Sequence, residues 1–429
     1  MEERFDAIVV GGGLAGLAAA YTLAENGKEV LVIERGDYSG AKNVTGGRIY
    51  MNPIRDLFPD LWKKAPLERA ITHEEVSILD KTRSITVRYS GEELAQEPYQ
   101  SYSVLRGRFD RYFAKRAERK GAMIVTKTRV DDLIIEKGKV DGVIAAGDEL
   151  RADVVIACDG VLSFTAEKAG LRKPGKPKDH AVGFKEVIEL DSDIIENRFN
   201  LEANQGAARL YMGEVTQGKF GGGFLYTNKE SLSLGIVVGI QALMEEEPRI
   251  AAPDMLDLFK QRPEVACLIK DGQTVEYSAH VIPEGGYNSL TKLYGNGILV
   301  AGDAAGFSMN IGVTVRGMEY AMASGYYAAQ AVLQAQNRQD YSAAALSVYE
   351  QLLNDSFVMK DFKTFQNAPE ALDHKRFFTH YPKLAGDIMQ ELYYVPAGPK
   401  QRIYPSIKKH LPFKELWAML KDFRKVKKL

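Results

Sequence analysis

The chain has 429 residues, of which 45% are hydrophobic and 26% charged, and its formal net charge at pH 7 is −1. It is long enough for two or three globular domains, and its charge balance gives no reason to expect a nucleic-acid partner. Two cysteines exclude a disulfide framework and a four-thiolate iron–sulfur cluster, and the six histidines show no metal-ligand spacing. We expect a cytoplasmic location. The longest apolar stretch, residues 232–244, is short and contains glycines, so membrane contact is expected only at the surface.

The N-terminal residues predict a nucleotide-binding strand–helix–strand unit. Residues 5–10 and 30–33 are typical of buried parallel strands, and residues 14–26 have helical spacing. Gly11, Gly13 and Gly16 stand between strand and helix in the order G-x-G-x-x-G. The first permits a tight turn, the second lets a pyrophosphate reach the backbone, and the third lets the helix pack on the strand. The free N–H groups at the helix start (Leu14, Ala15) favour phosphate, and Glu34 would accept hydrogen bonds from ribose hydroxyls. The unit alone leaves FAD and NAD open.

The following segments predict a cofactor-covering loop and further strands. Residues 39–50 are polar and glycine-rich, as in loops that cover a cofactor. We expect a hairpin over 76–79 and 84–89, a helix over 106–121, and strands over 122–126, 130–136, 140–145 and 153–157. Asp159 and Gly160 follow the last of these strands, where open α/β sheets bind ligands.

A Pro/Gly/Lys segment at residues 171–178 predicts a domain boundary. Strands over 181–190, 207–212, 223–226 and 232–240 follow without helices between them, which indicates an antiparallel sheet. After a helix from Pro253 and a strand over 275–282, the α/β pattern returns in a strand that ends at Gly302 and Asp303. We expect a long helix from Gly312 to Gln336. Taken alone, Asp303 is also compatible with a simple helix cap.

Together these motifs resemble the FAD-binding fold of the glutathione-reductase type, in its p-hydroxybenzoate-hydroxylase-like branch. The resemblance implies that FAD is the cofactor, that Asp303 holds its ribityl chain, and that a helix N-terminus at Asn310–Val313 points at the flavin. It also implies that Arg106 approaches the pyrophosphate. The predicted cofactor-binding residues are Gly11, Gly13, Leu14, Ala15, Gly16, Glu34, Arg35, Asn43, Gly46, Gly47, Arg106, Val130, Asp159, Gly160, Gly302, Asp303, Asn310, Gly312 and Val313.

Three segments, residues 40–47, 279–287 and 301–310, narrow the resemblance to the electron-transfer flavoprotein:quinone oxidoreductase family and its FixC branch. The fused members of that family carry a C-terminal iron–sulfur domain, whereas the FixC branch uses a separate ferredoxin-like iron–sulfur subunit. The missing cysteines favour the FixC branch. The resemblance implies electron transfer from the alpha and beta subunits of an electron-transfer flavoprotein to quinone, within a bifurcating complex at the inner face of the cell membrane. The rival functions are an aromatic monooxygenase, a geranylgeranyl-lipid reductase, and a flavin-bearing scaffold without catalysis.

The fold class expected is α/β, or α+β overall: a Rossmann-like FAD-binding domain, an inserted antiparallel substrate domain and a helical C-terminus. The FAD-binding domain would comprise residues 1–75, 101–177 and 277–355, the substrate domain 76–100 and 178–276, and the C-terminal region 356–429. Because the flavin does the redox chemistry, no side chain is predicted to be catalytic, and no metal is expected. Lys42, Asn43 and Arg48 are either flavin contacts or loop-surface residues. Aromatic side chains of the antiparallel sheet line a quinone pocket or are plain core: Tyr211, Phe220, Phe224 and Tyr226.

The C-terminus from Ile407 to Leu429 combines an apolar stripe at helical spacing with cations. The stripe comprises Leu411, Phe413, Leu416, Trp417, Leu420 and Phe423; the last turns carry Lys421, Arg424, Lys425, Lys427 and Lys428. Two interpretations stay open. The helix either packs on the body with a solvated cationic face, or contacts anionic lipid or the ferredoxin-like partner.

Overall fold

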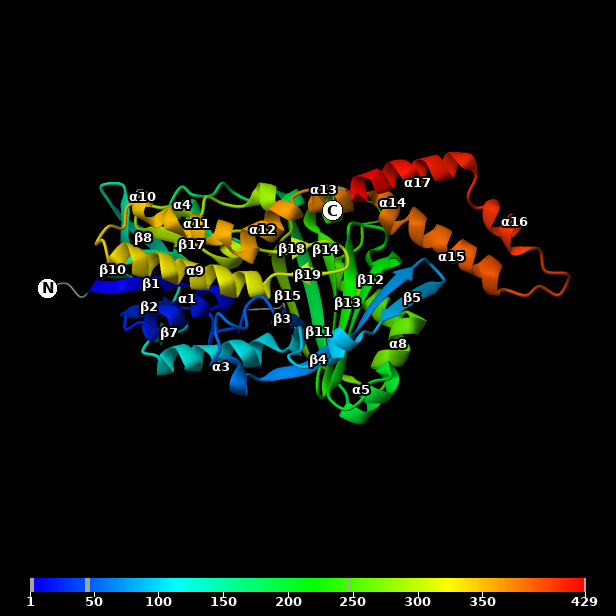
Figure 1. The fold of residues 1–429 in the computed structure, drawn as a ribbon, viewed down its shortest axis with the longest axis horizontal. Coiled ribbons are helices and arrows are strands. Elements are labelled where there is room, and N and C mark those ends of the chain that lie inside the picture. Colours follow the sequence, from blue (N-terminus) through cyan, green and yellow to red (C-terminus); the bar gives the residue numbers. More distant parts are fainter. Residues whose placement is uncertain (1–3, 43–46, 246, 248, 428–429) are drawn as a thin grey trace.

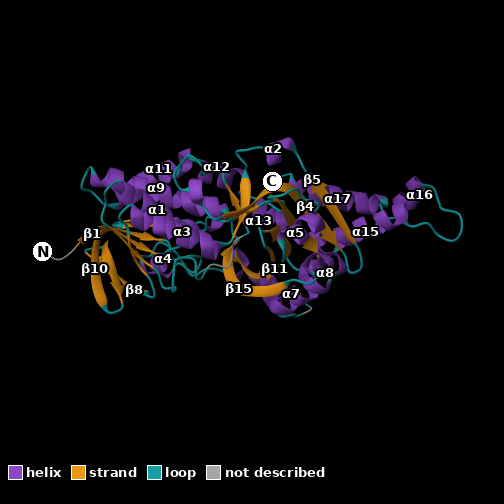
Figure 2. Ribbon diagram, turned by 90° about the horizontal axis from the view of Figure 1, so that it is seen from below, coloured by secondary structure: helices purple, strands orange, loops and turns teal. Residues whose placement is uncertain are grey.

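The computed structural model describes residues 4–42, 47–245, 247 and 249–427. In this part of the chain the strands form three sheets (Figures 1 and 2). The larger two lie side by side, and helices cover their outer faces. Asn43 and Gly46, two of the predicted site residues, lie outside the described residues.

Sheet A is built around parallel strands in the order β17-β10-β1-β2-β7. Because β1 and β2 are covered on both faces, they consist almost entirely of apolar residues. Antiparallel strands extend the sheet through β16, β9 and β8. The strands are β1 (Arg4–Val10), β2 (Val30–Ile33), β7 (Met123–Val125), β8 (Val130–Glu136), β9 (Lys139–Ala145), β10 (Asp148–Ala157), β16 (Tyr294–Gly295) and β17 (Ile298–Val300).

Helix α1 (Leu14–Glu25) packs against α9 (Met318–Gln336) and α3 (Arg106–Arg119) beside sheet A. Alanines dominate the buried face of α1, which lets these helices approach closely. The other helices of this body are α4 (Phe164–Lys168), α10 (Ala343–Leu346), α11 (Val348–Asp355) and α12 (Phe357–Thr364).

Helix α9 begins at Met318, so the prediction of a helix from Gly312 is wrong for its first turns. The preceding residues form a small hairpin of β18 (Met309–Asn310) and β19 (Val315–Arg316). Val313, Thr314 and Val315 are β-branched, which disfavours a helix, and Gly312 takes a positive φ of 87°.

Sheet B has the strand order β15-β11-β14-β13-β12-β4-β6-β3, with β5 paired to β4. Neighbours are antiparallel except β12 and β4, which are parallel. The strands are β3 (Arg48–Tyr50), β4 (Leu67–Leu79), β5 (Ser84–Tyr89), β6 (Ser101–Val104), β11 (His180–Glu189), β12 (Gln205–Gly213), β13 (Gly221–Thr227), β14 (Ser231–Gly239) and β15 (Gln273–Pro283). Since β4 runs through residue 75, one strand crosses the predicted domain boundary; the domain division stays a prediction.

The face of sheet B turned away from sheet A forms a second apolar core around Leu225, Leu234 and Phe259. Helices α5 (Ser192–Phe199), α7 (Ala252–Gln261) and α8 (Pro263–Ile269) cover it. Two shorter helices are α2 (Glu92–Ala95) and α6 (Ile240–Glu245). Tyr211 packs edge-on against Phe259, with 4.8 Å between ring centroids, so of its two interpretations the structure agrees with plain core.

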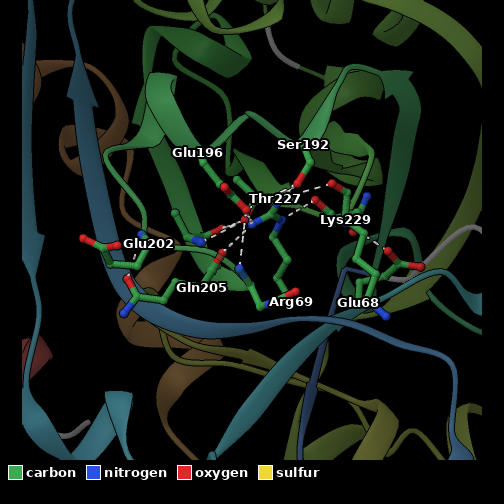
Figure 3. A network of polar contacts seen from close by, with 12 residues as sticks. Glu68, Arg69, Ser192, Glu196, Glu202, Gln205, Thr227 and Lys229 are labelled. Carbon is green, nitrogen blue, oxygen red and sulfur yellow. Dashed lines mark hydrogen bonds and ion pairs between the residues drawn. The ribbon is translucent and has the colours of Figure 1, made fainter. Parts of the chain in front are cut away.

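A buried arginine joins the ends of several inner strands of this sheet (Figure 3). Arg69, 1% exposed, donates from Nη1 to Oε1 of Glu196 at 2.7 Å and from Nη2 to Oγ of Ser192 at 2.6 Å. It also donates to the backbone carbonyls of Gln205, Asn228 and Lys229. One guanidinium thus joins β4, α5, β12 and the turn between β13 and β14.

The C-terminal residues form an arm that extends beyond sheet B (orange to red in Figure 1). Helix α15 (His380–Tyr393) leads outward, α16 (Ile403–Lys408) lies at the far end, and α17 (Phe413–Val426) returns toward the body. Helices α13 (Ala368–Leu372) and α14 (Lys375–Phe378) precede the arm. In the described part of the chain, each helix is too short or too polar to cross a bilayer.

Helix α17 turns its acids inward and its apolar stripe outward. Glu415 accepts a hydrogen bond from His380 Nε2 at 2.7 Å, and the buried Asp422 accepts one from Tyr381 Oη at 2.6 Å. In contrast, Phe413 is 79% exposed, Trp417 58% and Leu420 65%. Phe423, at the end of the stripe, packs against Phe377 and Tyr381, with 6.3 and 5.8 Å between ring centroids. The helix therefore contacts the body while most of its stripe faces outward, and both interpretations stay open.

Candidate cofactor site

The glycine turn between β1 and α1 has the geometry of a phosphate-binding loop. Gly11 has a φ of 105°, and a Cβ there would lie 2.3 Å from the Cys158 carbonyl oxygen. A Cβ on Gly16 would lie 2.0 Å from the Gly11 carbonyl oxygen, so the helix can approach the strand only with glycine there. Gly13 is the N-cap of α1, and Leu14 and Ala15 form its first, buried turn. The N–H groups of this turn point to the end of sheet A where the parallel strands finish.

Glu34 follows β2 and lies at the same edge of the sheet. Its Oε2 accepts the Gly12 N–H at 2.8 Å, and its Oε1 accepts the Gly36 N–H at 2.6 Å. Both oxygens thus help to shape the glycine turn, and each retains a lone pair for a further donor. Arg35 is exposed beside it, and Val130 is half-buried at the start of β8.

Asp159 extends from the end of β10. Its Oδ2 accepts the Thr165 N–H at 2.9 Å, whereas Oδ1 is buried without a hydrogen-bond partner among the described residues. Burial raises the pKa of this carboxyl, and the hydrogen bond from Thr165 opposes the rise. The next residue, Gly160, has a φ of 80°.

Asp303 extends from the end of β17, in a short 3-10 turn (Gly302–Ala304). Burial raises the pKa of its carboxyl to about 6, and the Arg106 guanidinium lowers it in part. Arg106 is engaged through Nε and Nη2 by Asp110, at 2.7 Å each, which leaves Nη1 for another acceptor. Gly302 has a φ of 67°, and a Cβ there would lie 2.7 Å from Ala15 Cβ. The turn of Asp303 therefore touches the glycine-started helix α1.

The hairpin of β18 and β19 holds the remaining predicted residues. Asn310 Oδ1 accepts the Gly312 N–H at 2.8 Å, and Val313 is 62% exposed. Since α9 starts only at Met318, the helix N-terminus lies at Gly317 rather than between Asn310 and Val313. The prediction that a helix N-terminus lies near Gly312 and points its dipole at the flavin is therefore wrong.

One face of sheet B lies toward this site. Residues that pair directly on neighbouring strands lie on the same face of a sheet. Tyr226, Ala208 and Glu74 share one face in this way, and Phe224, Gly235 and Lys185 lie on the same face. A Cβ on Gly47 would lie 2.2 Å from Tyr226 Cδ2, so the end of the 39–50 loop rests on this face. Phe224 and Tyr226 stack with 5.3 Å between centroids, whereas Phe220 packs against Phe378 of α14.

A polar cluster that the sequence did not predict adjoins Tyr226. The Tyr50 ring lies near two guanidiniums, with 4.3 Å from its centroid to Arg48 Cζ and 5.8 Å to Arg316 Cζ. Arg48 donates to Glu74 at 2.7 Å, and Arg316 donates to the fully buried Glu319 at 2.6 Å. Glu319 Oε2 has no hydrogen-bond partner among the described residues, and burial raises the pKa of its carboxyl. The sequence feature that could have predicted this cluster is the presence of two charged residues, Arg316 and Glu319, in an otherwise apolar segment.

These features fit a bound FAD. The glycine turn admits phosphate, and the unpartnered Asp159 oxygen and the half-buried Asp303 carboxylate suit donors such as sugar or ribityl hydroxyls. A buried acceptor without a donor costs about 1–3 kcal/mol, so such a ligand stabilises the site.

The sequence matches two family models: "FAD binding domain" over residues 4–203 and "ETF-QO/FixC family C-terminal domain" over residues 368–429. It is 47% identical to "Protein FixC" of Escherichia coli (strain K12) over 95% of both chains. It is 42% identical to the "Probable electron transfer flavoprotein-quinone oxidoreductase YdiS" of the same organism over 98% of both.

Solved structures share the fold. A geranylgeranyl bacteriochlorophyll reductase-like protein from Thermoplasma acidophilum superposes with a TM-score of 0.73 at 22% identity, covering 98% of this chain and 99% of that one. The myxobacterial halogenase CndH has a TM-score of 0.67 at 18% identity, with 91% and 90% covered. The expected α/β fold with a helical C-terminus is confirmed, and so is FAD as the cofactor. The chain belongs to the ETF-QO/FixC family and is an FAD-dependent electron-transfer flavoprotein oxidoreductase.

Proposed function

We propose that the protein accepts electrons from an electron-transfer flavoprotein and reduces quinone. The observation that carries the proposal is the aromatic face of sheet B, where Phe224 and Tyr226 lie beside Tyr50 and two guanidiniums. A quinone ring needs apolar contact on its faces and donors at its carbonyl oxygens. This face offers both.

FAD held by the residues of the cofactor site would supply the redox chemistry, in which a quinone is converted to quinol by two electrons and two protons. The side chains around it hold and orient the substrate. Burial raises the pKa of Tyr226 to about 12 and also raises that of Tyr50, so both phenols keep their protons at neutral pH. Each can therefore donate a hydrogen bond to a quinone oxygen.

The quinone assay uses reduced electron-transfer flavoprotein as donor and a water-soluble quinone as acceptor. We expect turnover, and a loss of about tenfold or more in kcat/KM for the Tyr50→Phe and Tyr226→Phe pair if two donors of about 1 kcal/mol each are removed. Leu225→Ile, on the opposite face, is the control. NAD(P)H-driven oxygen consumption would indicate a monooxygenase, prenyl-chain saturation a lipid reductase, and no turnover a scaffold.

We also propose that the residues predicted from the sequence contact FAD. Asp303→Ala would remove an acceptor for the ribityl chain, and Gly13→Val would place a side chain where the pyrophosphate reaches the backbone. Both should lower the flavin-to-protein absorbance ratio severalfold. Gly398→Val, at an exposed position with open space, is the control. A full flavin complement in both variants would contradict the placement.

We further propose that the chain works in a bifurcating complex with the alpha and beta subunits of the electron-transfer flavoprotein and a ferredoxin-like iron–sulfur subunit. The two free cysteines support a separate cluster-bearing subunit, because one is buried and the other stands alone on the surface. Iron analysis of the isolated chain should read near zero, and native purification should retain the partners. Stoichiometric iron in the isolated chain would contradict this.

The outward stripe of α17 supports a peripheral position on the inner face of the membrane. Exposed Phe413, Trp417 and Leu420 are flanked by the exposed cations Lys414, Lys421 and Arg424. Apolar side chains with neighbouring cations suit the interface of an anionic bilayer, where each cation contributes about 1 kcal/mol. Such a position would bring the site to a lipid-soluble quinone.

Cosedimentation with anionic liposomes tests this position. Phe413→Ser/Leu420→Ser should reduce binding at least tenfold with FAD content unchanged. Val87→Ser/Val275→Ser removes two comparably exposed apolar side chains from sheet B and should leave binding unchanged. Loss of the iron–sulfur subunit instead, with liposome binding intact, would assign the stripe to that partner.

A further inference from the structure

Lys185 is a buried lysine in the middle of β11, and it is 3% exposed. Its register partners are Gly235 on β14 and Ser278 on β15, so small residues flank it on both sides. Within the described part of the chain, its Nζ pairs with Oε1 of Glu276 at 3.6 Å. That distance exceeds a hydrogen bond, and the Glu276 side chain is itself 53% exposed.

The Lys185 side chain lies on the sheet face turned toward the cofactor site. Gly235 pairs with both Lys185 and Phe224, so the lysine and the aromatic pair occupy the same face. The next residue, Glu186, lies on the opposite face, where Lys260 of α7 binds it at 2.8 Å. The two lysines therefore differ: Lys260 binds a carboxylate at 2.8 Å, whereas the carboxylate that Lys185 pairs with among the described residues, Glu276, lies at 3.6 Å.

Other cations lie near Lys185. Burial lowers its pKa, Glu276 opposes this, and Arg106 lowers it further. Arg106 and Arg35 also lower the pKa of His280, two rows away on β15, after the larger effect of burial. Burying an ammonium without a close acceptor costs several kcal/mol, so this position favours a ligand that carries negative charge.

We propose that Lys185 is a positioning residue whose ammonium stabilises the negative charge that the bound cofactor gains on reduction. The inference rests on the cofactor placement of the proposed function, but not on quinone as the acceptor. Two points favour the redox-active end of FAD over its phosphates. Lys185 shares its face with Phe224 and Tyr226, and the phosphates already have the glycine turn and Arg106.

The test measures the two-electron midpoint potential and the FAD content of the FAD-bound protein. Lys185→Met should weaken the preference for the reduced form about tenfold, which corresponds to a midpoint potential lower by about 30 mV. Its FAD content should stay unchanged. Lys185→Arg should restore the potential, and Lys260→Met, which removes a cation from the other side of the same strand, should leave it unchanged.

Three results would overturn the proposal: an unchanged potential in Lys185→Met, an equal shift in Lys260→Met, or loss of FAD in place of the shift. The last would assign the ammonium to the phosphates. If Lys185→Met does not fold, Lys185→Gln replaces it, because glutamine keeps a polar side chain of similar length. Loss of FAD from both the methionine and the glutamine variant counts against the proposal. A shifted potential without quinone turnover would separate this inference from the proposed function.

Discussion

Gly325 of α9 lies against the backbone of Ala15 in α1. A Cβ on Gly325 would lie 2.0 Å from the Ala15 carbonyl oxygen, so these two helices meet at a distance that only glycine permits. Ala15 is also the residue against which the turn of Asp303 rests. This crossing therefore sets the distance between the glycine turn and the Asp303 carboxylate.

Gly325→Ala should force α9 away from α1. Overpacking of this kind lowers the free energy of unfolding by about 1–3 kcal/mol, and the shift should also lower FAD content. Gly107→Ala is the matched control, because a Cβ there meets only Tyr38 Oη at 3.9 Å. That change should be neutral or stabilising by up to about 1 kcal/mol, as alanine is the better helix former. Urea unfolding measures both variants.

Asp303 should make FAD-free protein less stable as the pH rises. Its pKa is raised from 3.8 to about 6 by burial, so between these values the folded state holds a proton that the unfolded state has lost. The free energy of unfolding should therefore fall from pH 4 to pH 6, by up to about 3 kcal/mol, and level off above. Asp303→Asn should remove this fall. Denaturant unfolding at several pH values measures it, and an equal slope in the variant would contradict the assignment.

Arg69→Met should strongly destabilise the chain. The change leaves Glu196 and three carbonyl oxygens without their shared donor, and breaking a buried pair costs about 3–5 kcal/mol. Arg249→Met is the control, because Arg249 pairs with Glu247 on the surface with its side chain 75% exposed, and it should cost less than about 0.5 kcal/mol. An equal effect of both changes on urea unfolding would show that Arg69 does not hold sheet B together.

The two cysteines should differ in reactivity. Cys158 is buried at the end of β10, and burial raises the pKa of its thiol far above the ordinary value, whereas Cys267 is exposed. Since the thiolate is the nucleophile, iodoacetamide at pH 8 should modify only Cys267 in native protein. After unfolding in guanidinium, both should react. Mass spectrometry of alkylated peptides checks this, and rapid labelling of native Cys158 would contradict its placement.

The sequence predicted β1, α1 and β2 well, because the residue patterns that specify them are local. Buried parallel strands are continuous apolar runs, and glycines at Gly11 and Gly16 are required by their immediate neighbours. Asp159 and Asp303 were found for the same reason, since each directly follows a buried strand. Their assignment as FAD contacts stays a prediction.

Periodicity identified the stripe of α17 but could not decide which side of that helix faces the body. The orientation of α17 is set by His380 and Tyr381 of α15, which bind Glu415 and Asp422 of α17. The same limit applies to Tyr211, because its aromatic side chain is compatible with either face of β12 until its contact with Phe259 is seen. The start of α9 was placed too early because glycine at Gly312 was taken as a helix start, although β-branched residues follow it.

The order of strands in the two large sheets has a consequence for synthesis of the protein on the ribosome. The middle strand β10 of sheet A pairs with β1 on one side and with β17, residues 298–300, on the other. In sheet B, one edge of β4 is unpaired until β12, residues 205–213, has been synthesised. Both sheets thus keep open edges until most of the chain has left the ribosome, and open edges invite pairing with other chains. We therefore expect chains that terminate before residue 298 to accumulate in aggregates, and nascent chains to need protection by chaperones until the last strand of sheet A emerges.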